Sequence, residues 1–301
     1  MTVGFLDQVK GIVTNNIQLR EHRVMFRKAP PSNRNFADVM NHYHVEKALA
    51  TKLKQASREQ RKVIYATMYD ELFAKVPDHP RLTQRDTPKL RASRLRNKMA
   101  FLRRFLSRDK TLVEFAPGDC KLLHAAAERS QFAIGVDISD QRASGDAGPG
   151  NAELVVYDGY DLSRIASESI DVAFSDQLIE HFHIDDTRLH FETALRILKP
   201  SGEYAFRTPH RFTGPHDVSQ YFSDVPEGFH LKEWTYAETK SLLNAVGFSS
   251  YKCYWSAKFI HLRLPGIYFS IAEVLIKPLP NKFRGLVAKL LMPSVTISAK
   301  K

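Results

Sequence analysis

The chain has 301 residues, enough for one large domain with additions, and its 43% hydrophobic content can supply a sizeable core. The charged fraction of 26% is ordinary for a globular protein, and two cysteines, Cys120 and Cys253, are too few for a disulfide framework. We therefore expect a cytoplasmic protein of a reducing compartment, with no signal peptide and no membrane-spanning segment.

The formal net charge of +11 is unevenly distributed. Between Arg81 and Lys110 the chain carries eleven lysine and arginine residues against two aspartates. A patch of this kind attracts nucleic acid, anionic lipid or a phosphorylated substrate. A solvated helix face explains the same charges, and the sequence leaves both interpretations open.

The first third of the chain is predicted to be helical. Apolar residues recur at helical spacing between residues 44 and 76, and Ser57 with Gln60 matches a capping box. The string "VPDHP" ends this pattern. From Pro88 to Leu106 the spacing predicts a basic amphipathic helix. Residues 1–94 are therefore interpreted as a helical N-terminal extension.

After Lys110 short apolar runs alternate with helical patterns. The runs, in order, are "TLVEF", "FAIGVDI", "AELVVY", "IDVAFS", "GEYAFR", "YKCYWS" and "SVTISAKK". Alternation of this kind predicts a doubly wound α/β sheet. Such sheets bind their ligands outside the carboxyl ends of the strands.

Polar residues mark those predicted strand ends. Glu114 lies in the first run and is followed by a turn at Gly118, Asp137 ends the second run, and Asp158 follows the third. A carboxylate after the second strand accepts hydrogen bonds from both hydroxyls of a ribose, and one after the third can accept from an adenine amino group. The turn contains a single glycine instead of the G-x-G-x-x-G that pyrophosphate needs. This pattern favours a nucleoside without phosphates, such as S-adenosylmethionine (SAM).

The same stretches resemble a known family. "VEFAPGDCKLL" resembles motif I of class I SAM-dependent methyltransferases, "GVDIS" their ribose-binding strand end, and "ILKPSGEYAFRTP" the approach to their fifth strand. The resemblance covers about residues 97 to 248. It implies a Rossmann-like methyltransferase domain over residues 95–301, with a mostly parallel seven-stranded sheet, an antiparallel last strand and a helical insert at 259–292.

The resemblance also implies roles for individual residues. Asp137 would bind the ribose and Asp158 the adenine, with Asp161 as the alternative to Asp158. Ala116 and Cys120 stand where the family has the first and third glycines of its motif. The full set of expected SAM-binding residues is Glu114, Ala116, Gly118, Cys120, Asp137, Ile138, Asp158, Gly159 and Ser175.

A hydroxyl acceptor needs a base, and histidine suits this role near neutral pH. Histidines follow the fourth predicted strand at His181 and His183 and the fifth at His210 and His216. We expect His210 or His216 to be the base, with His181 as the next candidate. No metal is expected, because the spacing matches no recognised ligand motif.

The segment "GPHDVSQYFSDVPEGFHLKEWTYAE" is similar to bacterial methyltransferases associated with surface polysaccharide synthesis. This similarity implies O-methylation of a small molecule, a saccharide or a lipid-linked glycan. Residues 259–292 are apolar and basic, which suits a lid or a helix pair in peripheral contact with an anionic membrane.

Two other functions remain open at this level. The first is an RNA methyltransferase that uses the basic N-terminal helix, although no RNA-binding module and no N-P-P-Y string are present, so nucleic acid is not the expected partner. The second is a SAM-binding or scaffold protein without turnover. The sequence patterns do not predict an oligomeric state.

Overall fold

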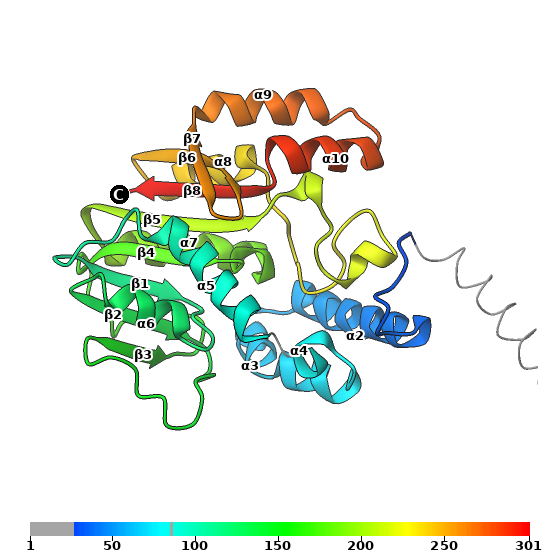
Figure 1. Cartoon of the computed structure of the whole chain (residues 1–301), viewed down its shortest axis with the longest axis horizontal. Helices are drawn as coiled ribbons and strands as arrows, with labels where there is room; N and C mark the ends of the chain where they lie inside the picture. The colour runs from blue at the N-terminus through cyan, green and yellow to red at the C-terminus, as the bar shows by residue number, and fades with distance from the viewer. Residues whose placement is uncertain (1–26, 85–86) are drawn as a thin grey trace, which may run out of the picture.

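The computed structural model describes residues 27–84 and 87–301, in which helices of the first third precede an eight-stranded sheet with further helices around it (Figure 1). The expected absence of a signal peptide concerns residues outside this part. Within it, no helix combines the length and the apolar composition that a membrane crossing requires.

The N-terminal helices are α2 (Phe36–Gln55), α3 (Arg58–Lys75), α4 (Pro80–Thr83) and α5 (Pro88–Leu102). The capping box predicted at Ser57 is confirmed: its side chain accepts from the backbone of Gln60, and the Gln60 side chain accepts from the backbone of Ser57. This box starts α3 directly after α2 has ended at extended Ala56. The basic helix α5 begins at the predicted Pro88 and ends at Leu102 rather than Leu106.

The sheet has the order β3-β2-β1-β4-β5-β8-β6-β7. Its strands are β1 (Thr111–Phe115), β2 (Phe132–Asp137), β3 (Ala152–Val156), β4 (Ile170–Asp176), β5 (Leu198–Pro209), β6 (Ser250–Ala257), β7 (Ile260–Leu264) and β8 (Ser294–Lys300). The first five strands run parallel to one another, and β8 is antiparallel to both β5 and β6. The doubly wound fold with an antiparallel last strand is confirmed.

The predicted helical insert at 259–292 is wrong in its first part. Residues 260–264 form β7, which pairs with β6 as an antiparallel hairpin and adds an eighth strand. His261 is buried between the exposed residues Ile260 and Leu262, as expected for a strand with one covered face. The remainder of the insert is helical, as α9 (Gly266–Ile276) and α10 (Asn281–Leu291).

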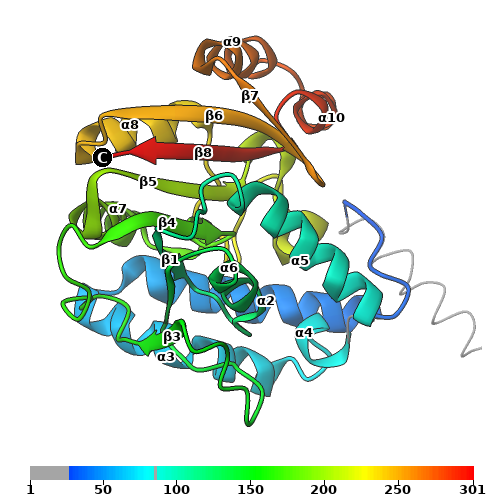
Figure 2. The same cartoon turned by 60° about the vertical axis from the view of Figure 1, so that its left-hand side comes forward.

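Helices cover the two faces of the parallel strands (Figure 2). On β1, Leu112 packs in a cluster with residues of α5 and α6 (Lys121–Ala127), whereas the next residue, Val113, packs in a cluster with residues of α7 (Ile184–Ile197) and α8 (Tyr236–Val246). The two-residue period of a strand explains this division. Both faces are therefore covered, as a doubly wound sheet requires.

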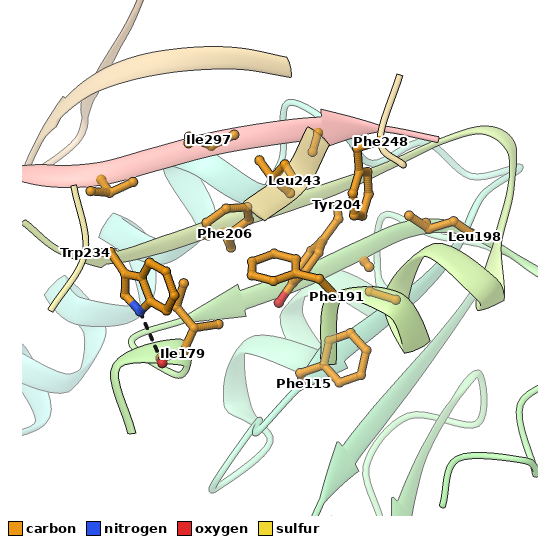
Figure 3. Packing of buried hydrophobic residues seen from close by; sticks show 14 of the residues in the cluster. Phe115, Ile179, Phe191, Leu198, Tyr204, Phe206, Trp234, Leu243, Phe248 and Ile297 are labelled. Carbon is orange, nitrogen blue, oxygen red and sulfur yellow. Dashed lines mark hydrogen bonds between the residues drawn. The ribbon is translucent and has the colours of Figure 1, made fainter. Parts of the chain in front are cut away.

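The larger core lies under α7 and α8 (Figure 3). Phe191 contacts Tyr204 and Phe206 of β5, with ring centroids 5.6 and 5.3 Å away. At the carboxyl edge the indole Nε1 of Trp234 donates to the carbonyl oxygen of Ile179 over 3.4 Å. This bond holds the short helix η1 (Ile179–His181), which follows β4, against the segment that leads into α8.

The N-terminal helices pack against loops at the carboxyl edge of the sheet. The hydroxyl of Tyr65 in α3 accepts from the backbone N–H of His183, over 2.8 Å. Glu46 of α2 accepts from the N–H of Phe229, whose ring is buried with residues of α2 and α3. The extension therefore borders the edge at which this fold places its ligands.

Candidate functional site

The loop after β1 has an unusual backbone. Ala116, Gly118 and Cys120 have φ values of 54°, 58° and 58°, in the left-handed region that glycine favours. The loop thus keeps left-handed geometry at the two positions where the sequence lacks glycine. Non-glycine residues in this region store about 1–2 kcal/mol of strain each, and such strain is frequent where backbone approaches a ligand. Cys120 is buried, and burial raises the pKa of its thiol to about 11, so it is not a nucleophile.

Two buried carboxyl groups flank this loop. Glu114 is 4% exposed, burial raises its pKa to about 8, and its Oε2 has no hydrogen-bond partner within the described residues. Asp137 accepts from the N–H groups of Gly118 and Ser139, and burial raises its pKa even though these bonds oppose the shift. Ile138 follows Asp137 at the same strand end.

The predicted adenine-binding acid already has partners. Asp158 accepts from the backbone of Tyr160 and Asp161, over 2.9 and 2.8 Å, and forms an ion pair with Lys62 of α3. The bond from Lys62 is the main reason why the pKa of Asp158 falls to about 2. Gly159 takes a φ of 88°, and an added Cβ there would lie 3.7 Å from Ile138. The strand ends of β2 and β3 are therefore adjacent.

At the end of β4, Ser175 and Asp176 point to different partners. The hydroxyl of Ser175 lies 2.7 Å from that of Tyr204, inside the core. Asp176 accepts two bonds from Arg207, over 2.7 and 3.0 Å, and lies 3.3 Å from Lys98 of α5. Burial opposes ionisation of Asp176, but the two cations outweigh it and lower its pKa. Sequence reasoning did not assign these roles to Lys98 and Arg207.

His210 is not placed to act as a base. It is fully buried, its Nε2 lies 3.0 Å from Glu273 of α9, and its Nδ1 accepts from the backbone of Phe212. Glu273 also accepts from the backbone N–H of Tyr236 at the start of α8. These contacts engage both ring nitrogens of His210 and make it a structural link between the end of β5 and α9.

His216 also has both nitrogens engaged. Its Nε2 lies 3.1 Å from the hydroxyl of Thr213, and its Nδ1 lies 3.1 Å from Glu233. Burial opposes ionisation of Glu233, but hydrogen bonds with His216 and His230 lower its pKa to about 2. Glu233 is therefore a buried carboxylate that orients two histidines.

One ring nitrogen of His181 has no hydrogen-bond partner among residues 27–84 and 87–301. Its Nδ1 lies 2.9 Å from the carbonyl oxygen of Phe229. Since a carbonyl oxygen can only accept, Nδ1 carries the proton and donates, and Nε2 carries the lone pair. Burial lowers the pKa of His181 to about 3, and its ring lies edge-on to that of His230 at 5.0 Å. The preceding residue, Glu180, is fully buried, and burial raises its pKa to about 7.

The structure thus divides the predicted residues into groups. One group gathers around the ends of β1, β2 and β3; it contains Glu114, Ala116, Gly118, Cys120, Asp137, Ile138, Asp158 and Gly159. His181 lies beyond the end of β4 in a polar cluster that also contains Glu180 and His230. His210 is turned away into the core under α9. The positions of His230 and Glu233 were not predicted, because nothing near them in the sequence marks them.

Comparisons with known proteins agree with the fold. Residues 113–206 match the family described as a methyltransferase domain. A chain of the complex between the Haloferax volcanii Trm112 methyltransferase activator and a methyltransferase has a TM-score of 0.50 and 17% identity, covering 70% of this chain and 90% of that one. No curated protein sequence matches the chain.

A second similar structure is Haemonchus contortus phosphoethanolamine N-methyltransferase 1, solved with phosphoethanolamine and S-adenosylhomocysteine. It has a TM-score of 0.53 and 14% identity, covering 81% of this chain and 50% of that one. The likeness to both structures is one of fold.

The fold and the strand-end site define a Rossmann-like methyltransferase. Residues 113–206 match a methyltransferase domain, and the fold is similar to that of class I SAM-dependent methyltransferases. The match supports a transferase activity with SAM as the cofactor.

Proposed function

We propose that this enzyme transfers the methyl group of SAM to a hydroxyl group of a small molecule or a saccharide, free or lipid-linked. The observation that carries the proposal is the polar cluster of Glu180, His181 and His230 directly beyond the end of β4. A hydroxyl must lose its proton as the methyl group arrives, and this cluster supplies unengaged acceptor atoms at the expected edge.

The residues around β1 and β2 suit SAM. The left-handed loop would allow backbone to approach a ligand, the Asp137 carboxylate suits a ribose, and Oε2 of Glu114, which has no partner within the described residues, suits the methionine end. Asp158 would receive an adenine amino group on a carboxylate already held by Lys62. SAM supplies a methyl group on a cationic sulfur, which the acceptor oxygen displaces.

Among the three predicted bases, His181 is the candidate that we retain. His210 and His216 have both ring nitrogens in hydrogen bonds, whereas Nε2 of His181 has none within the described residues. The N-terminal helices border the same edge, so we propose that the extension of residues 1–94 covers the acceptor side.

An anionic membrane is the proposed location of a lipid-linked acceptor. Helix α9 exposes Ile267, Ile271 and Val274 on the face opposite its buried residues, and α10 exposes Phe283 and Leu286. Exposed basic residues accompany them, namely Arg263, Lys277, Lys282 and Lys289. An apolar stripe with flanking lysines is typical of helices that lie in a membrane interface. The enzyme would then act at the cytoplasmic face of a bacterial membrane, on an intermediate of surface-polysaccharide synthesis.

Methyl transfer is tested with SAM labelled in its methyl group and a panel of free and lipid-linked saccharides. We expect a labelled product that withstands mild alkali, as a methyl ether does and a methyl ester does not. Asp137→Ala is the control for SAM dependence. Labelling only of amines or carboxylates would contradict the proposal.

A further inference from the structure

Three metal-ligating side chains converge beyond the end of β4. Glu180 and His181 belong to η1, and His230 comes from the loop before α8. One ligand atom from each lies within 4.8 Å of the others. Residues this far apart in the chain meet because Trp234 and the carbonyl oxygen of Phe229 hold the two segments together.

Each histidine has its outward nitrogen fixed by an acceptor. Nδ1 of His181 donates to the Phe229 carbonyl oxygen, and Nδ1 of His230 lies 2.9 Å from the Glu233 carboxylate. An acceptor on Nδ1 requires its proton there and leaves the lone pair of a neutral ring on Nε2, where it can bind a metal. Metal-binding histidines are held by the same kind of outer contact.

Glu180 supplies an oxygen without a partner. The side chain is fully buried, its Oε2 accepts from the hydroxyl of Thr208 over 2.9 Å, and its Oε1 has no partner within the described residues. A buried carboxyl oxygen without a partner is costly, and a cation would satisfy it. His181 and His230 are only partly buried, which leaves an approach from solvent.

A second cluster of similar composition lacks these features. In the group of His42, Glu46 and His79, Nδ1 of His42 lies 2.9 Å from the guanidinium of Arg34, and its Nε2 lies 2.7 Å from Glu46. Arg34 can only donate, so Nδ1 accepts and Nε2 carries a proton. No lone pair of His42 is left for a metal, and an adjacent cation opposes one.

We propose that Glu180, His181 and His230 bind one divalent transition-metal cation of the Zn²⁺ or Fe²⁺ class, through one carboxylate oxygen and two imidazole nitrogens. Two histidines and one glutamate form a ligand set of catalytic zinc and non-haem iron sites, in which positions stay open for water or substrate. On the basis of the proposed function, the cation would bind the acceptor hydroxyl and acidify it. With the cation bound, His181 would act as its ligand, and the bound cation would replace His181 in the role of base.

Metal binding is measured on the full chain after chelator treatment, without SAM or acceptor. We expect about one equivalent of Zn²⁺ in calorimetry and a Co²⁺ visible absorption spectrum typical of nitrogen and oxygen ligands. His181→Ala, His230→Ala and Glu180→Gln should lose more affinity than the roughly 10–100-fold expected for Glu233→Gln or Thr208→Val, which remove outer contacts. His79→Ala, in the other cluster, should bind as wild type does.

Circular dichroism verifies that each variant is folded. If other variants do not fold, Thr208→Val remains useful, because valine has nearly the same shape as threonine. The proposal is overturned if folded, chelator-treated protein binds neither Zn²⁺ nor Co²⁺, or if both ions bind Glu180→Gln and the two histidine variants as tightly as wild type. SAM affinity is measured separately. Absence of metal binding can therefore be distinguished from absence of SAM binding and methyl transfer.

Discussion

Arg61 and Asp186 form a buried ion pair that joins the N-terminal helices to the methyltransferase sheet. Nε and Nη2 of Arg61 in α3 each lie 2.7 Å from a carboxylate oxygen of Asp186 in the first turn of α7. The two side chains are 6% and 9% exposed. Hydroxyls of Tyr65 and Tyr160 also donate to this carboxylate. The extension is thus anchored to the sheet domain by a fully hydrogen-bonded charge pair.

Removal of one partner should strongly destabilise the protein. Arg61→Ala leaves the Asp186 carboxylate buried without its counter-charge, and we expect a loss of about 3–5 kcal/mol in the free energy of unfolding. Arg188→Ala, which breaks an exposed pair with Glu192, should cost no more than about 0.5 kcal/mol. Chemical denaturation of both variants provides the comparison. Equal losses would show that the buried pair is not an anchor.

Asp137 should determine SAM affinity. Asp137→Ala removes the carboxylate expected to bind the ribose, and we expect about 1.5–3 kcal/mol weaker binding, or roughly 10–150-fold. Asp109→Ala removes an exposed carboxylate at the opposite edge of the sheet and serves as control. Calorimetry with S-adenosylhomocysteine measures both. Wild-type affinity in Asp137→Ala would exclude the ribose assignment.

Gly135 in β2 should tolerate no side chain. An added Cβ would lie 2.9 Å from Leu123 of α6 and 3.0 Å from Pro117 of the loop after β1. Gly135→Ala should therefore cost about 1–3 kcal/mol of stability through overpacking. Gly150→Ala, where nothing lies within 4 Å, should stay within about 0.5 kcal/mol of wild type. Denaturant titration separates the two cases.

Glu114 should make stability depend on pH. Its pKa rises from 4.5 in the unfolded chain to about 8 in the folded protein, because it is buried. Between these values the folded state holds a proton that the unfolded state has released, so stability falls as pH rises, by up to about 1.4 kcal/mol per pH unit. Glu114→Gln lacks this contribution.

The test compares unfolding free energies of wild type and Glu114→Gln between pH 5 and 9. As the pH increases, the unfolding free energy of wild type should fall relative to that of Glu114→Gln. The difference between the two should become constant above about pH 8. Parallel curves would mean that Glu114 is ionised in the folded protein.

Helices α9 and α10 should bind anionic vesicles. We expect flotation with phosphatidylserine vesicles at low salt and release at high salt, where surface charges are screened. Lys282→Glu should weaken binding by at least about 5-fold, since one lysine near such a surface contributes about 1 kcal/mol. Leu286→Asn tests the apolar contribution, and Lys54→Glu on α2 is the charge-matched control. Equal effects of the two lysine variants would assign the binding to net charge alone.

Much of the fold was predictable because its signals are local. The runs from Thr111 onward matched the strands to within a few residues, and Ser57 starts α3 through the predicted capping box. The strand β7 was not predicted, because it has only five residues and is followed by two apolar helices. The two-residue period of so short a segment is too weak to distinguish a strand from a helix.

The sequence also predicted that Glu114, Asp137 and Asp158 lie at the same edge of the sheet. Each acid is in or directly after a strand, and parallel strands place their carboxyl ends together. Tertiary packing alone decided the state of the histidines. His210 follows β5 as predicted, but Glu273, 63 residues away, engages its ring in the core. His230 lies near Glu180 only because the loop before α8 packs beside the segment that follows β4. Local periodicity encodes the elements, whereas contacts between distant residues depend on how those elements pack.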